Sequence, residues 1–99
     1  MAQLRYLEQA RRDLLVIKRY IQNESGSRNV ALQFTDKLRE QCRKLAELPG
    51  TLGRARPELM PDVRSFAYGN YVILFRYNAS VVDIISIIEG HRDIEEWFR

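Results

Sequence analysis

Hydrophobic residues in the first half of the chain recur at the spacing of two amphipathic helices. The first series lies between Glu8 and Glu24 and consists of Ala10, Leu14, Ile17 and Ile21. The second series runs to about Leu48 and consists of Ala31, Phe34, Leu38, Cys42 and Leu45. Gly26 separates the two, because glycine readily takes the left-handed conformation that ends many helices, and Ser25 or Ser27 can cap the helix that follows. The pattern therefore predicts a helical hairpin over residues 8–48.

The remaining segments have the pattern of strands. Residues 3–7 alternate, with Leu4 and Tyr6 on one side, which predicts a short first strand. Apolar runs separated by turn residues predict three further strands, at residues 62–68, 71–77 and 81–88. Because their connections are short, these three strands should form an antiparallel meander. Residues 49–61 hold all three prolines and are predicted to be a loop, and residues 92–98 to be a short helix.

These elements predict an α+β fold in a single domain, residues 1–99, with the order β-α-α-β-β-β and a short C-terminal helix. The helical hairpin should cover one face of an antiparallel sheet. The other sheet face and the loop before it should then be free to bind another macromolecule.

The charge is unevenly distributed along the chain. Residues 1–56 hold 12 Lys and Arg against 6 Asp and Glu, a net charge of +6, whereas residues 57–99 hold 4 against 7, a net charge of −3. Such a basic half favours an anionic partner, and it is also compatible with an ordinary solvated helical surface. Without a leader-like N-terminus or a long apolar run, the sequence is expected to be cytoplasmic and to have no membrane partner.

Arginines gather in the predicted sheet region and are the main candidates for binding. Arg54 and Arg56 lie in the loop, Arg64 and Arg76 on the meander, and Arg92 just after it. Guanidinium groups bind phosphates and carboxylates in bidentate fashion, so the cluster predicts an anion-binding surface. The alternative is local ion pairing, of Arg92 with Glu89 or Glu96 and of Arg56 with Glu58 or Asp62.

Residues with catalytic or anchoring potential are few. His91 is the only histidine, Cys42 the only cysteine, and all three lysines fall on the predicted helices. A general acid or base at His91 would lack an obvious second group, and no metal site or cofactor is expected. Trp97 and Phe98 are either anchors at a protein interface or core residues of the last helix.

Several short segments, in order, resemble the ParE branch of the RelE/ParE toxin superfamily. They include Ala10-Arg11-Arg12-Asp13-Leu14, Tyr20-Ile21, Ser25-Gly26, Leu45-Ala46-Glu47-Leu48-Pro49, Gly53-Arg54-Ala55-Arg56-Pro57-Glu58-Leu59, Val63-Arg64-Ser65-Phe66, Gly69-Asn70-Tyr71-Val72-Ile73-Leu74-Phe75-Arg76 and Gly90-His91-Arg92-Asp93-Ile94. No single segment is specific, but their order and spacing together are, and the predicted topology agrees with that fold.

The resemblance implies a toxin of a type II toxin–antitoxin system. It implies a ParD-like antitoxin as partner, contact with operator DNA only through that antitoxin, and DNA gyrase as the target, whose cleaved-DNA complex the toxin stabilises without catalysis. The residues that we expect to bind the target or the antitoxin are the candidates given above: Arg54, Arg56, Arg64, Arg76, Arg92, Trp97 and Phe98. The alternative within the superfamily is a ribosome-dependent mRNA endonuclease of the RelE type, in which His91, Arg76 and Arg64 would act on RNA.

Overall fold

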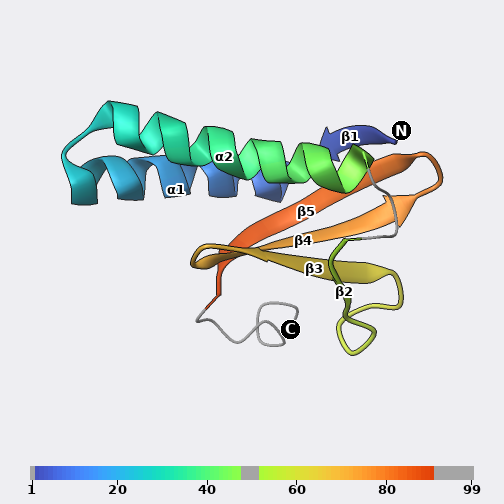
Figure 1. Ribbon diagram of the computed structural model, residues 1–99. Coiled ribbons are helices and arrows are strands. Elements are labelled where there is room, and N and C mark those ends of the chain that lie inside the picture. The colour runs from blue at the N-terminus through green and yellow to red at the C-terminus, as the bar shows by residue number, and fades with distance from the viewer. Residues whose placement is uncertain (1, 48–51, 91–99) are drawn as a thin grey trace.

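The computed structural model describes residues 2–47 and 52–90. Its elements follow the order β1 (Gln3–Tyr6), α1 (Glu8–Ser25), α2 (Arg28–Glu47), β2 (Arg54–Ala55), β3 (Val63–Tyr68), β4 (Tyr71–Asn78) and β5 (Val81–Glu89). The two helices lie side by side over one face of the sheet (Figure 1). The predicted α+β class and helical hairpin are confirmed. The predicted C-terminal helix, residues 92–98, lies outside the described residues.

Both helix ends between α1 and α2 form as their sequence predicts. Gly26 ends α1 with a φ of 69°, and its backbone N–H donates to the carbonyl of Gln22. Ser27 caps the N-terminus of α2, since its Oγ accepts a hydrogen bond from the backbone N–H of Val30 at 3.2 Å. These two residues reverse the chain within a few positions, so the helices must run antiparallel.

The sheet is mixed, whereas the sequence pattern predicted an antiparallel one. Within the described residues it has the strand order β1-β5-β4-β3-β2, and β1 pairs with β5 in parallel. The register places Leu4 beside Val82 and Tyr6 beside Ile84. The meander β3-β4-β5 is antiparallel as predicted, because two-residue turns join its strands. No such turn joins β1 to β5. In the described part of the chain, two helices and three strands lie between them, and this long connection allows a parallel pairing.

The predicted loop over residues 49–61 contains a strand that the sequence pattern did not indicate. β2 has only two residues, and it pairs Arg54 with Ser65 and Ala55 with Arg64 of β3. Gly53 comes directly before it with a φ of 84°, and a Cβ there would lie 2.6 Å from Cζ of Phe75. Only glycine allows the backbone to approach the core this closely, so Gly53 fixes where β2 can begin.

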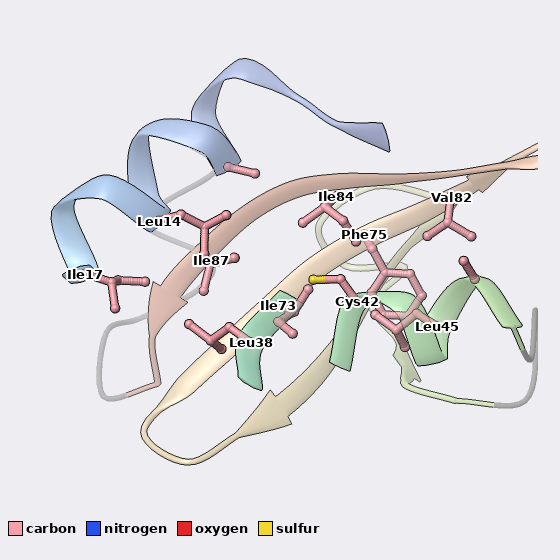
Figure 2. Packing of buried hydrophobic residues seen from close by; sticks show 12 residues of the cluster. Leu14, Ile17, Leu38, Cys42, Leu45, Ile73, Phe75, Val82, Ile84 and Ile87 are labelled. Atoms are coloured by element: carbon pink, nitrogen blue, oxygen red, sulfur yellow. The ribbon is translucent and has the colours of Figure 1, made fainter. Parts of the chain in front are cut away.

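The hydrophobic core lies between the helices and the near face of the sheet (Figure 2). Its buried members from the helices include Leu14, Ile17, Leu38, Cys42 and Leu45, and those from the strands include Ile73, Phe75, Val82, Ile84 and Ile87. Phe34 is only partly buried and contacts the rings of Tyr68 and Tyr71. Burial raises the pKa of the Cys42 thiol to about 11, so this side chain is a neutral part of the core at physiological pH.

The opposite face of the sheet differs from the open surface that the sequence led us to expect. Val63, Leu74 and Ser86 alternate with the residues that face the helices, and all three are buried. The expectation of a wholly free face is therefore wrong for its central residues. The arginines of this face, described next, reach solvent.

Candidate anion-binding site

A buried carboxylate joins two arginines on the sheet face turned away from the helices. Asp83 of β5 lies in register with Arg5 of β1 and with Arg76 of β4. Nε and Nη2 of Arg5 donate to the two carboxylate oxygens of Asp83 at 2.7 and 3.0 Å. Nε of Arg76 donates to Oδ2 of Asp83 at 3.4 Å. These three residues, from three adjacent strands, form what we call the Arg5–Asp83–Arg76 triad.

The triad combines a fully buried anion with partly exposed cations. Asp83 has no exposed surface, whereas the side chain of Arg5 is 54% exposed and that of Arg76 is 32% exposed. The hydrogen bonds from Arg5 and then Arg76 lower the pKa of Asp83, and they outweigh the opposing effect of burial. Asp83 therefore stays ionised at neutral pH. Since a guanidinium has five N–H donors, each arginine keeps donors for a further acceptor.

Arg56 extends this charged face toward the β2 edge. Its backbone N–H donates to the carbonyl of Val63 at 2.8 Å, and its Nε donates to Oγ of Ser65 at 2.9 Å. Its Nη1 lies 3.5 Å from Oε1 of Glu58, so the predicted local ion pair with Glu58 forms. Arg54 is in register with Ser65 and is exposed. Arg54 and Arg56 therefore share the face of the triad.

Arg64 lies on the other face of the sheet. It is in register with Phe75, whose ring belongs to the core beneath the helices, while its neighbour Val63 is in register with Arg76. Nη2 of Arg64 donates to the carbonyl of Gly53 at 3.0 Å and lies 3.5 Å from that of Leu52. Arg64 thus holds the segment that leads into β2, and the structure does not bring it together with Arg76.

Four of the predicted site residues, His91, Arg92, Trp97 and Phe98, lie outside the described residues. Their roles stay predictions from the sequence.

Two residues of the triad escaped the sequence reasoning, although each carried a signal. Arg5 alternates with Leu4 and Tyr6, which already placed it on the opposite side of the first strand. Asp83 is the only charged residue within the apolar run of residues 81–88. A charge inside a buried strand needs a partner, so this position predicts a nearby cation. That Arg5 is one such cation could not be predicted without knowing that β1 pairs with β5 in parallel.

Asp13 on α1 has a different task at the edge of β5. β1 pairs with Val81–Ile84, and within the part of the chain that the structure describes no strand pairs with the following part of β5 on that side. There, Oδ2 of Asp13 accepts hydrogen bonds from the backbone N–H of Ile87 at 2.9 Å and from Oγ of Ser86 at 2.5 Å. Asp13 thus takes the place of a neighbouring strand and attaches α1 to the sheet.

A hollow of about 310 Å³ lies beside this attachment. Its lining includes the apolar or aromatic residues Val16, Tyr20 and Tyr71 together with the acidic residues Asp13 and Glu89. With two carboxylates and no basic residue in its lining, this hollow does not favour an anion. A second hollow, of about 460 Å³, has Arg11, Lys18 and Arg39 in its lining. The described residues therefore offer basic side chains to an anion both in that hollow and on the face of the triad, where a buried carboxylate orients them.

Metal binding and membrane insertion find no support in the described residues. Over residues 2–47 and 52–90, no group of three or more His, Cys, Asp or Glu side chains is placed to hold a metal ion. Neither of the two described helices has the length and apolar character needed to cross a membrane.

Solved structures place the fold in a known class. The chain has a TM-score of 0.76 and 24% identity to a chain of the chromosomal ParDE toxin–antitoxin system from P. aeruginosa, over 90% of this chain and 96% of that one. It has a TM-score of 0.66 and 21% identity to a chain of the RelBE2 toxin–antitoxin complex from Mycobacterium tuberculosis, over 89% and 96%. The fold is thus RelE/ParE-like. A search of curated protein sequences returns no match.

The fold is shared by RelE-like and ParE-like toxins, whereas the sequence matches one family in particular. The profile of the ParE toxin of the type II toxin–antitoxin system parDE matches residues 4–94. The chain therefore belongs to the ParE toxin family, as its sequence motifs led us to expect.

Proposed function

We propose that this ParE-family toxin inhibits DNA gyrase by binding the state of the enzyme in which DNA is cleaved. The observation that carries the proposal is the family match, which spans residues 4–94 and so covers nearly the whole chain. A protein that binds one state of an enzyme more tightly than the others raises the population of that state. Cleaved DNA then accumulates although the toxin performs no chemistry itself.

We further propose a ParD-like antitoxin as the neutralising partner, with operator DNA reached only through that antitoxin and with the cytoplasm as the place of action. The proposal is supported by the similar solved structures, which come from a ParDE system and a RelBE2 toxin–antitoxin complex. The exposed arginines of the triad face offer donors to an acidic antitoxin segment or to the target. Arg54, Arg56 and Arg76 are the described candidates, and Arg92, Trp97 and Phe98 are the remaining ones.

The positions of the basic residues favour binding over RNA cleavage. The three lysines lie on α1 and α2, which cover the face opposite the triad. Arg64 and Arg76 lie on different faces of the sheet, so they cannot act together on one phosphate. Of the residues assigned to the nuclease alternative, only Arg76 and His91 are then left for one site.

Purified toxin and purified gyrase test the proposal. We expect the toxin to inhibit supercoiling and to convert plasmid DNA into gyrase-linked linear DNA. Intact gyrase activity at high toxin concentration would sink the proposal.

A parallel assay with translating ribosomes tests the nuclease alternative. Cleavage of ribosome-bound mRNA that disappears in His91→Ala would establish the nuclease. Uncleaved mRNA together with an SOS response in toxin-expressing cells is the expected outcome.

A further inference from the structure

Three arginines cross the sheet in one row. Val63 lies in register with Arg76, and its carbonyl accepts the backbone N–H of Arg56. The row therefore runs from Arg5 on β1 past Asp83 on β5 to Arg76 on β4, and past β3 to Arg56. We call Arg5, Arg76 and Arg56 the arginine row. Because neighbouring strands lie about 4.8 Å apart, the Cα atoms of successive arginines are about 10 Å apart along it.

At Arg5 and Arg76, the row presents positive charge while the anion that holds them is buried. Asp83 is fully buried beneath Arg5 and Arg76, so an approaching anion meets the partly exposed guanidinium groups and not the carboxylate. Three arginines and one aspartate give the row a net charge of +2. Within residues 2–47 and 52–90, one further acidic side chain pairs with the row: Glu58, which is 43% exposed and lies 3.5 Å from Arg56 at the outer end. Counting Glu58 lowers the net charge to +1.

Asp83 fixes the orientation of the two arginines that it binds, Arg5 and Arg76. An arginine that is free in solution loses side-chain freedom when it binds a ligand, and this loss weakens binding. The two-point contact of Arg5 with Asp83 and the bond from Arg76 hold both side chains before any ligand arrives. Each guanidinium then needs little reordering to offer its remaining donors to a phosphate.

We propose that the arginine row binds the phosphate backbone of DNA, with Asp83 as its positioning residue and Arg5 as a binding residue. A line of planar bidentate donors fits a polymer with regularly repeating phosphates. This inference rests on the proposed function, since gyrase holds DNA where the toxin would act. An acidic protein segment is the competing ligand, and the experiment separates the two.

The test measures binding of the full-length toxin to a short fluorescent DNA duplex, without gyrase, as salt is varied. Three phosphate contacts predict a slope of log K against log salt of about −3. Arg5→Gln, Arg76→Gln and Arg56→Gln should each reduce the magnitude of the slope by about 1. Arg19→Gln is the matched control, because Arg19 is exposed on α1 and belongs to no described ion pair.

Equal losses in Arg19→Gln and the row variants would mean diffuse attraction and would overturn the proposal. The proposal would also be overturned if the toxin bound a polyglutamate peptide more tightly than the duplex and if the row variants weakened that peptide binding to the same extent. Since gyrase is absent, these results are independent of gyrase inhibition. If the toxin binds DNA through the row but leaves gyrase active, the DNA-binding inference holds and gyrase is wrong as the proposed target.

Asp83→Asn separates positioning from charge. Removing the carboxylate makes the row more positive, so simple attraction predicts tighter DNA binding, whereas a positioning role predicts weaker binding by several-fold. Tighter binding would overturn the role of Asp83. Arg5→Lys, which keeps the charge but cannot bind both carboxylate oxygens in the same way, should also bind DNA less tightly. Thermal melts identify any variant that fails to fold. If Asp83→Asn fails to fold, the DNA affinity of Arg5→Lys tests the positioning role in its place.

Discussion

The same strands build both faces of the sheet, but different interactions hold the side chains on each face. The face beneath the helices is fixed by apolar packing of residues such as Ile73 and Phe75. The other face carries Asp83, which is fixed by charged hydrogen bonds to Arg5 and Arg76. Packing needs only hydrophobic surface of the right volume, whereas the ionic arrangement depends on particular partners. Substitutions of the apolar residues on the first face should therefore affect folding, and substitutions of the partly exposed arginines on the second face should affect binding.

The register of the paired strands decides on which face of the sheet each arginine lies. Arg64 and Arg76 lie on adjacent paired strands, yet Arg64 is opposite Phe75 and Arg76 is opposite Val63. A difference of one residue in register places a side chain on the other side of a sheet. Arg64 therefore supports the fold near Gly53, while Arg76 reaches the charged face.

The largest effect is expected in the core. Ile73→Ala should lower the free energy of unfolding by about 2–5 kcal/mol, because it removes a fully buried side chain and leaves a cavity. Chemical denaturation measures the loss. Leu15→Ala is the control, since Leu15 is 56% exposed and should change the stability by less than about 0.5 kcal/mol. Equal losses at the two positions would contradict the division between core and surface.

The next effect concerns the ion pairs of Asp83 and their dependence on pH. The pKa of Asp83 is lowered in the folded protein by Arg5 and Arg76, so its contribution to stability is present above the ordinary Asp pKa of about 3.9. This contribution is lost as the pH falls through the lower pKa of the folded state. The stability difference between wild type and Asp83→Asn, measured from denaturation curves, should therefore shrink below about pH 4. A difference that stays constant into strong acid would show that the carboxylate charge contributes nothing.

A smaller loss is expected at the attachment of α1 to β5. Asp13→Ala removes the acceptor for the backbone N–H of Ile87 and for Ser86, and should cost about 1–2 kcal/mol. Asp36→Ala is the control, because Asp36 is exposed and its contact with Arg39 is 3.8 Å long. Hydrogen exchange at the Ile87 amide gives a local readout, and unchanged protection in Asp13→Ala would contradict the attachment.

The smallest effect is expected for the ion pair on the outside of α1. Arg12 donates to Glu8 at 2.6 Å, but both side chains are mostly exposed. Arg12→Ala should cost no more than about 0.5 kcal/mol, because exposed ion pairs in helices contribute little. The thermal midpoint measures it, and a loss as large as that of Asp13→Ala would mean that this surface is more tightly organised than the structure indicates.

Most of the fold could be predicted because its signals are local. The helical spacing, Gly26 and the turn residues Gly69-Asn70 set the bounds of α1, α2 and the meander to within a few residues. Local signals do not specify partners that are far apart in the sequence. The parallel pairing of β1 with β5 joins residues 78 positions apart, and its existence depends on the packed helices between them.

The candidate site was predicted less well than the fold, for the same reason. A cluster of arginines is visible in the sequence, but sharing a face depends on register, which separated Arg64 from the others. Arg5 joins the site only through the parallel pairing, and Asp83 gains its role through its contacts with both Arg5 and Arg76. The two-residue strand β2 was missed because it is too short to show alternation, and its position depends on Gly53.

The most direct measurement is a gyrase cleavage titration with wild-type toxin, Arg5→Gln, Arg76→Gln and Arg19→Gln. We expect linear, gyrase-linked DNA with wild type and Arg19→Gln at the same toxin concentration. Arg5→Gln and Arg76→Gln should need several-fold more toxin. Absence of cleaved DNA at any concentration of folded wild-type toxin would contradict the account.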